Sequence, residues 1–150
     1  MATIYDDVTF APMNYGLDQA EVRRRTMHAL ERVKIAHLAD KKIYQLSGGE
    51  KKLASIATVL SMEPRALLLD EPSVALDPQN RRNLIHVLNE LSMTKVIASH
   101  DLDFIYDTCD RTIILHHGRV VEDGDTRKIL QDQKLLESYG LELPLSFSRR

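Results

Sequence analysis

The spacing of apolar residues predicts two amphipathic helices in the first part of the chain. A capping box, formed by Asp18 and Glu21, opens the first helix. Its buried face is expected to carry Val22, Leu30 and Val33. The second helix begins at Ser47, and its apolar face carries Leu53, Ile56, Ala57 and Leu60.

A different pattern marks the elements that follow. Four apolar residues in a row, Ala66–Leu69, predict a strand that is covered on both faces. Asp77 and Pro78 have the residue types of an N-cap and a first helical position, so they open a third helix. A short strand is predicted at Lys95–Ala98.

The last part of the chain predicts a hairpin and a helix. Ile113–Leu115 and Arg119–Glu122 have the pattern of two strands joined by a turn at His117–Gly118. Thr126 is expected to cap a last helix that runs through Leu136. Because strands alternate with helices, the sequence predicts an α/β fold with a mostly parallel sheet.

Composition narrows the class of protein. In 150 residues, 20 basic and 22 acidic side chains leave a net charge of −2, which gives no electrostatic footprint for nucleic acid. The single cysteine, Cys109, cannot form an internal disulfide and favours a reducing compartment. No apolar run reaches the roughly 18 residues that a membrane span needs, and the first residues do not resemble a signal peptide. A role at a membrane would therefore be carried out from the aqueous side.

A first candidate site lies at the predicted start of the second helix. Ser47 can cap this helix and Glu50 can return a hydrogen bond, so a capping box alone explains both residues. Gly48 and Gly49 are unfavourable in a first helical turn, however, and glycine permits a ligand to approach the backbone closely. Together with the positive end of the helix, they favour a phosphate site. Local chemistry supports the two interpretations equally.

Two adjacent carboxylates end the predicted buried strand, at the sheet edge where α/β proteins bind ligands. Because adjacent residues on a strand point to opposite faces, Asp70 and Glu71 are expected to have different roles. Asp70 suits Mg²⁺, directly or through water, and Glu71 suits a general base that orients or deprotonates water. A solvated acidic loop fits less well, because no polar spacer separates Asp70 from the apolar run.

Other polar residues have simple structural explanations beside functional ones. An N-cap role is sufficient for Asp77. A lone histidine is more often structural than catalytic. His100, however, lies just after the C-terminal end of a predicted strand, a place equivalent to that of the two carboxylates, and could contact a terminal phosphate. The adjacent His116 and His117 are expected at the surface rather than in a joint metal site.

Taken in order, these segments resemble the motifs of the ATPase domain of ABC transporters. Leu46–Glu50 resembles the signature motif, and Leu67–Glu71 resembles Walker B with its catalytic glutamate. Ala75–Asp77 resembles the D-loop, and His100 resembles the switch histidine. Four motifs in sequence at family-like spacing are far more specific than one alone.

The flanking segments narrow the resemblance to energy-coupling-factor importers, which include cobalt and nickel uptake ATPases. The similar segments, Ile4–Pro12, Asn14–Leu17 and Leu135–Pro144, extend the resemblance over nearly the whole chain. It implies a P-loop NTPase-like parallel sheet with a helical subdomain, incomplete at the N-terminus. Residues 1–60 would form the helical subdomain with the signature helix, and residues 61–150 the remainder of the catalytic core.

The resemblance also implies that ATP and Mg²⁺ are the cofactors. Two ATPase subunits, identical or different, would pair head to tail around two ATP molecules. Ser47, Gly48 and Gly49 of one subunit would contact the γ-phosphate of ATP held by the other, and Asp77 would link the two sites across the dimer.

Hydrolysis is implied at the second group of residues. Asp70 would help to hold Mg²⁺, Glu71 would polarise the attacking water, and His100 would steady the γ-phosphate. Separation of the subunits after hydrolysis would drive transmembrane subunits, which places the chain at the cytoplasmic face of the membrane. The implied process is uptake of cobalt or nickel ions or of a vitamin.

Two features depart from the family pattern. Glu50 stands where the signature usually has glutamine, and we expect its carboxylate to face its own helix start, since a second anion would repel ATP. The sequence G-x-x-x-x-G-K-[ST] of the phosphate-binding P-loop does not occur. We therefore expect the C-terminal part of an ABC ATPase, which starts inside the helical subdomain and is inactive alone.

Two other functions stay open. The chain could be a non-catalytic interaction protein that lends Ser47–Gly49 to a partner with a P-loop. It could also be one lobe of a split ABC-type ATPase of chromosome maintenance or DNA repair, although Met1–Gly16 shows no coiled-coil heptads. The transported substrate is not readable from the sequence, since membrane subunits select it.

Overall fold

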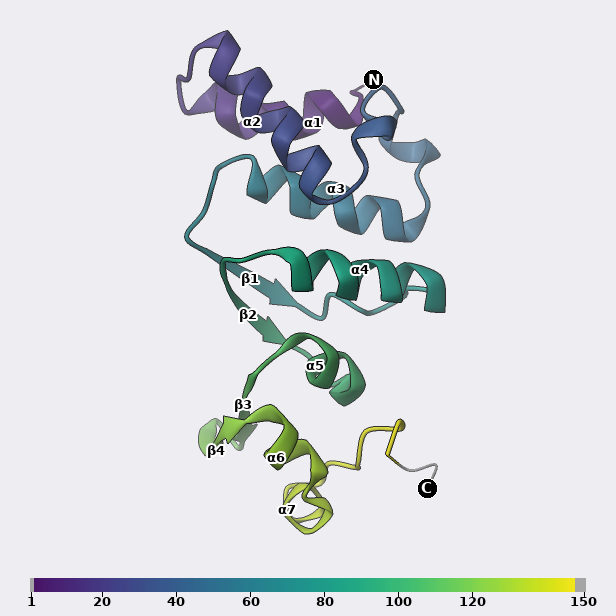
Figure 1. The fold of residues 1–150 in the computed structure, drawn as a ribbon, viewed down its shortest axis with the longest axis vertical. Helices are drawn as coiled ribbons and strands as arrows, with labels where there is room; N and C mark the ends of the chain where they lie inside the picture. The colour runs from purple at the N-terminus through teal and green to yellow at the C-terminus, as the bar shows by residue number, and fades with distance from the viewer. Residues whose placement is uncertain (1, 148–150) are drawn as a thin grey trace. The chain divides into compact units, whose positions relative to one another are not determined.

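The computed structural model describes residues 2–147, whose helices and strands are labelled in Figure 1. Two compact units divide the chain. The first unit comprises the residues up to Leu69 together with Val74–Val96. The second comprises Asp70–Ser73 and the residues from Ile97 onward. The expected division at residue 60 concerns functional subdomains, and it stays a prediction.

Three helices of the first unit pack against one another (Figure 1): α1 (Ile4–Asn14), α2 (Gln19–Arg32) and α3 (Gly48–Leu60). Two short 3₁₀ helices, η1 (Ala36–Leu38) and η2 (Ile43–Gln45), connect α2 to α3. In the part of the chain that the structure describes, no helix is both long and apolar enough to cross a bilayer.

The N-terminal ends of α1 and α2 differ from the sequence prediction. The helix α1 was not predicted, although Thr3 and Asp6 form a complete capping box at its start. Asp18 caps α2 as expected by accepting the backbone N–H of Glu21. The predicted return bond is wrong, because the Glu21 carboxylate pairs with arginine side chains of its own helix instead.

The strands β1 (Ala66–Asp70) and β2 (Thr94–Ala98) lie side by side as a parallel pair, connected through α4 (Pro78–Glu90). Both strands and the N-terminus of α4 agree with the predicted positions. The prediction that β1 is covered on both faces is wrong. Leu67 is 3% exposed and Leu68 is 76% exposed, because alternate residues face opposite sides and only one side is packed.

Among the described residues, five elements lie wholly in the second unit: α5 (Leu102–Thr108), β3 (Arg111–His116), β4 (Arg119–Asp125), α6 (Thr126–Gln131) and α7 (Gln133–Ser138). The strands β3 and β4 form the predicted antiparallel hairpin. His117 and Gly118 at its turn have φ values of 49° and 73°, the conformation that a tight hairpin turn requires.

The predicted last helix is wrong in its cap and in its continuity. Asp125 caps α6, whereas Thr126 is fully buried with its hydroxyl 2.8 Å from that of Thr112. The helix also ends before Asp132, whose side chain caps α7. A buried polar side chain needs a hydrogen-bond partner. The hydroxyl of Thr126 therefore bonds that of Thr112 in the interior and does not cap the helix.

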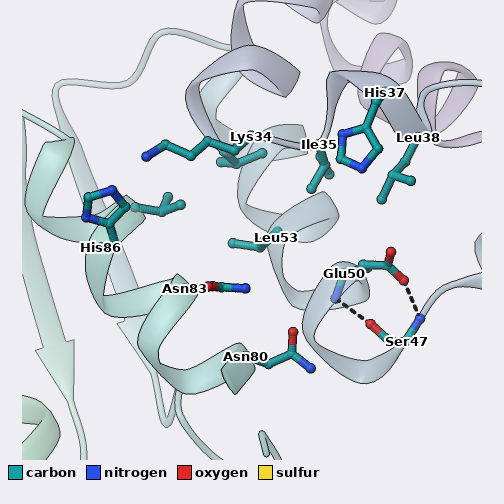
Figure 2. Close-up of a pocket in the computed structure, with 12 residues that line it drawn as sticks. Lys34, Ile35, His37, Leu38, Ser47, Glu50, Leu53, Asn80, Asn83 and His86 are labelled. Atoms are coloured by element: carbon teal, nitrogen blue, oxygen red, sulfur yellow. Dashed lines mark hydrogen bonds between the residues drawn. The ribbon is translucent and has the colours of Figure 1, made fainter. Parts of the chain in front are cut away.

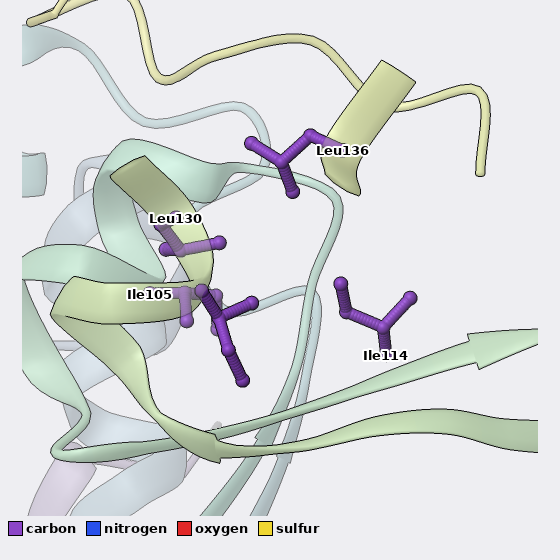
Figure 3. Packing of buried hydrophobic residues seen from close by; sticks show 5 residues of the cluster. Ile105, Ile114, Leu130 and Leu136 are labelled. Atoms are coloured by element: carbon purple, nitrogen blue, oxygen red, sulfur yellow. The ribbon is translucent and has the colours of Figure 1, made fainter. Parts of the chain in front are cut away.

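A cluster of buried aliphatic side chains forms the core of the second unit (Figure 3): Ile105, Ile114, Ile129, Leu130 and Leu136. They come from one strand and three helices that are separated in sequence. The cluster therefore holds α5, β3, α6 and α7 together.

Leu136→Ala should destabilise the chain, because it removes the burial of a fully buried side chain and leaves a cavity. We expect a loss of about 2–5 kcal/mol in the free energy of unfolding, measured in urea. The control is Leu145→Ala, since that side chain is 73% exposed and its truncation should cost less than about 0.5 kcal/mol. Equal losses for the two variants would contradict the buried position of Leu136.

Candidate functional site

The first candidate site is the turn at the start of α3, within the first unit. Ser47 Oγ accepts the backbone N–H of Glu50 at 3.2 Å, and Glu50 Oε2 accepts that of Ser47 at 2.7 Å (Figure 2). The bond from the Ser47 N–H is the main reason that the pKa of Glu50 lies below its ordinary value. The capping box is confirmed, and so is the prediction that Glu50 faces its own helix start.

The two glycines of this turn have different surroundings. Gly49 is buried, and a Cβ at this position would overlap the side chain of Asn80. Gly48 is exposed, and a Cβ there would meet only the carbonyl oxygen of Ala75, at 4.0 Å. Packing is thus sufficient reason for glycine at 49, whereas Gly48 is the one whose backbone is open to a ligand. Ligand contact at either position stays a prediction.

Asp77 caps α4 beside this turn. Its carboxylate accepts the backbone N–H of Asn80 at 2.9 Å and the side-chain Nδ2–H at 2.6 Å. The backbone bond is the main cause that lowers the pKa of Asp77. Ser47, Glu50 and Asn80 also line a cavity of about 350 Å³ (Figure 2). Asn80 therefore connects the predicted D-loop residue to the predicted signature turn.

The second candidate site lies where β1 and β2 end, and its residues belong to the second unit. Glu71 directly follows β1, and its backbone N–H donates to the carbonyl oxygen of Ala98 at 2.8 Å. This bond extends the pairing of the strands by one residue. Glu71 has a φ of 43°, a left-handed conformation that is unfavourable for a residue with a side chain and is often found at functional sites.

The carboxylate of Glu71 accepts three hydrogen bonds. Oε1 accepts the Nδ1–H of His100 at 2.7 Å and the backbone N–H of the same residue at 3.1 Å. Oε2 accepts the hydroxyl proton of Ser99 at 2.9 Å. Because an ionised carboxylate only accepts, Nδ1 of His100 must carry a proton. The expectation that Glu71 and His100 follow strands at one sheet edge is thus met by a direct contact.

Each of these two side chains changes the pKa of the other. The His100 ring is the main reason that the pKa of Glu71 lies below 4.5, and the Ser99 hydroxyl adds to the effect. Glu71 in turn raises the pKa of His100 above 6.5. Solvent weakens the pair, because the His100 side chain is 78% exposed and that of Glu71 is 37% exposed.

Asp70 ends β1 with an exposed carboxylate. A single exposed carboxylate suits Mg²⁺, which keeps several waters and takes other ligands from substrate phosphates. Within residues 2–147, no group of three or more His, Cys, Asp and Glu side chains could hold a metal ion. A magnesium ion at Asp70 would therefore need ligands that this part of the chain does not supply.

Two residues of these sites were not predicted. Ser99 could have been found, because it is polar and stands between a predicted strand and His100. Asn80 gives no such signal, since its contact with Gly49 joins the starts of two helices that are distant in sequence. The predicted residues divide between the two sites. The first site contains Ser47, Gly48, Gly49 and Asp77, and the second contains Asp70, Glu71 and His100.

Sequence comparison finds relatives along the chain. The sequence model of the family described as ABC transporter matches residues 1–74. A putative ABC transporter ATP-binding protein of Geobacter sulfurreducens is 53% identical over 146 residues, which cover 97% of this chain and 59% of that protein. The energy-coupling factor transporter ATP-binding protein EcfA of Carboxydothermus hydrogenoformans is 42% identical, over 96% of this chain and 54% of that protein.

The fold is similar to that of a solved structure, cbiO1 from Clostridium perfringens, which is described as part of the ABC transporter complex cbiONQ. The two match with a TM-score of 0.81 and 38% identity, over 91% of this chain and 56% of that chain. This likeness confirms the predicted ABC ATPase fold class. The chain spans just over half the length of each of these relatives.

Gly49→Ala should destabilise the first unit, because the added Cβ overlaps Asn80. Overpacking of this kind costs about 1–3 kcal/mol, and we expect a loss of that size in the free energy of unfolding. Gly48→Ala is the matched control, since it adds the same methyl group where the nearest atom lies at 4.0 Å. Equal losses for the two variants would contradict the close packing at Gly49.

The contact between Glu71 and His100 should make stability depend on pH. A raised pKa at His100 stabilises the fold fully below 6.5, and this contribution is lost as the pH rises through the folded-state pKa. A lowered pKa at Glu71 stabilises the fold above 4.5, and this contribution is lost as the pH falls. The pair therefore contributes most between these two values.

The pH dependence of this contribution can be measured by unfolding the wild-type chain and the His100→Asn variant in urea at a series of pH values. The difference in unfolding free energy between the two should be largest between pH 4.5 and 6.5 and should shrink on both sides. A difference that does not vary with pH would show that the two side chains do not interact in solution.

Proposed function

Because the chain shares its fold with ABC ATPase domains and is related in sequence to ABC transporter ATP-binding proteins, we propose that it is part of the ATPase subunit of an energy-coupling-factor importer. The observation that carries this proposal is the contact of Glu71 with His100 at the ends of two parallel strands. A base and a phosphate-binding histidine placed together suit the polarisation of water beside a terminal phosphate.

In this proposal, the turn at Ser47–Gly49 binds the γ-phosphate of ATP held by a second ATPase subunit. Its support is the exposure of Ser47 and Gly48 at the start of a helix of 13 residues, where N–H groups and the positive helix end favour anions. Glu50 does not oppose the phosphate, because its carboxylate is bonded to the Ser47 N–H. Asp77, at the adjacent cap of α4, would link the two nucleotide sites across the dimer.

The second site would supply the hydrolytic residues. Asp70 would hold Mg²⁺, which neutralises charge on the phosphates, and Glu71 would polarise the attacking water. The Nδ1 proton of His100 is already donated to Glu71, so its Nε2 can donate to a phosphate only when the ring is charged. The raised pKa of His100 supports this role, because it favours the charged ring.

We propose two kinds of protein partner, a second ATPase subunit and the transmembrane subunits of an importer. The names of EcfA, an energy-coupling factor transporter protein, and of cbiO1, a part of the complex cbiONQ, support this assignment. The chain would then act as a peripheral subunit at the cytoplasmic face of the membrane. Cobalt, nickel or a vitamin would be selected by the membrane subunits, and a net charge of −2 does not favour nucleic acid.

We also propose that these 150 residues do not hydrolyse ATP by themselves, because they contain no P-loop sequence. The purified chain with Mg-ATP should release no phosphate above the background of a Glu71→Gln chain. Rapid release by the wild-type chain alone would contradict this assignment of roles. The absence of a P-loop sequence also favours the second candidate function. In this function, the exposed turn at Ser47–Gly49 completes an ATP site on a partner, and this chain hydrolyses no ATP itself.

Gly48→Glu should weaken ATP-dependent association, because it places a negative charge where the phosphates would bind. The measurement is binding of the Glu71→Gln chain to the Geobacter sulfurreducens ATP-binding protein, with and without Mg-ATP. We expect ATP to promote binding, and Gly48→Glu to weaken it at least tenfold, or about 1.4 kcal/mol.

The matched control for this experiment is Ser55→Glu, which adds the same charge at an exposed position later in α3. It should leave ATP-dependent binding unchanged. Binding that is insensitive to ATP, or equally weakened by the two substitutions, would count against a phosphate site at the start of α3.

A further inference from the structure

Ser99 lies between the end of β2 and His100, and its hydroxyl has two partners. Its Oγ accepts the backbone N–H of Asp101 at 3.2 Å and donates to Oε2 of Glu71 at 2.9 Å. A hydroxyl has a single proton, and the amide N–H can only donate. The proton of Ser99 must therefore point at the carboxylate of Glu71.

Through this hydroxyl, the carboxylate of Glu71 is linked to the N-terminus of α5. Asp101, the partner of Ser99 on the other side, is the N-cap of α5, where its side chain accepts the backbone N–H of Phe104 at 2.9 Å. Ser99 is half-buried, whereas the ring of His100 is 78% exposed. Of the two side chains that hold Glu71, Ser99 is thus the more firmly placed.

We propose that Ser99 is a positioning residue that fixes the rotation of the Glu71 carboxylate, so that Oε1 faces His100 and the attacking water. The terminal torsion of a glutamate is soft, so one fixed oxygen is needed to orient the other. Without the hydroxyl, the carboxylate would be held through Oε1 alone, by the backbone N–H and the ring of His100. It would then rotate about that oxygen, and its contact with the ring would be weakened. The catalytic meaning of this residue rests on the proposed function, but the geometry can be tested without nucleotide.

The test is an NMR titration of the His100 ring in the 150-residue chain. Glu71 and Asp101 both raise the pKa of His100, and Asp101 is unchanged in every variant. We expect Ser99→Ala to lower the pKa of His100 toward 6.5, because its bond to Glu71 is weakened while the charges of Glu71 and Asp101 remain. Ser99→Thr, which keeps a hydroxyl, should hold the pKa near the wild-type value. Glu71→Gln should give the lowest pKa of His100 among these variants, because it removes the negative charge of the carboxylate.

The matched control is Ser138→Ala, which removes a hydroxyl that bonds the Leu135 carbonyl oxygen in the same unit and should not change the titration. A folded Ser99→Ala chain with the wild-type His100 pKa would overturn the proposal. A Ser99→Thr chain in which the pKa of His100 falls as far as in the alanine variant would also overturn the proposal.

If Ser99→Ala does not fold, Ser99→Cys takes its place, because the thiol is a weaker donor of similar size. An intermediate pKa of His100 supports the proposal, and a wild-type value overturns it. Loss of ATP-dependent association would not affect this titration, so the proposed function and the role of Ser99 fail separately.

Discussion

The parallel pairing of β1 with β2 is the constraint on which the candidate catalytic site depends. Both strands end at one edge, so Glu71 and Ser99 meet although 28 positions separate them in the sequence. The bond from the Glu71 N–H to the Ala98 carbonyl oxygen fixes the register at this edge. A shift of one residue would turn every side chain of the strand to the other face and separate the carboxylate from His100.

The start of α3 shows how one short segment serves both folding and a proposed ligand contact. The capping box of Ser47 and Glu50 determines where the helix begins, and packing against Asn80 requires glycine at position 49. These structural demands leave Gly48 as the position whose backbone is open. The two interpretations of the turn are therefore compatible, since different residues satisfy each of them.

Elements with local signals were predictable from the sequence, and elements decided by packing were not. The cap at Asp77 and the hairpin turn at His117–Gly118 follow from residues that are neighbours along the chain. The exposure of Leu68 does not, because an apolar run gives no information on which side is covered. The contact of Glu71 with His100 was foreseen only as a shared sheet edge, and the third partner, Ser99, was missed.

The left-handed backbone at Glu71 places stability and the proposed chemistry in competition at one residue. Such a conformation costs about 1–3 kcal/mol for a residue with a side chain, whereas glycine adopts it freely. A search for stabilising substitutions would therefore favour glycine at position 71 and would delete the carboxylate in the process. Engineering this chain for thermal resistance has to exempt that position, even though its backbone is among the first that such a search would select for change.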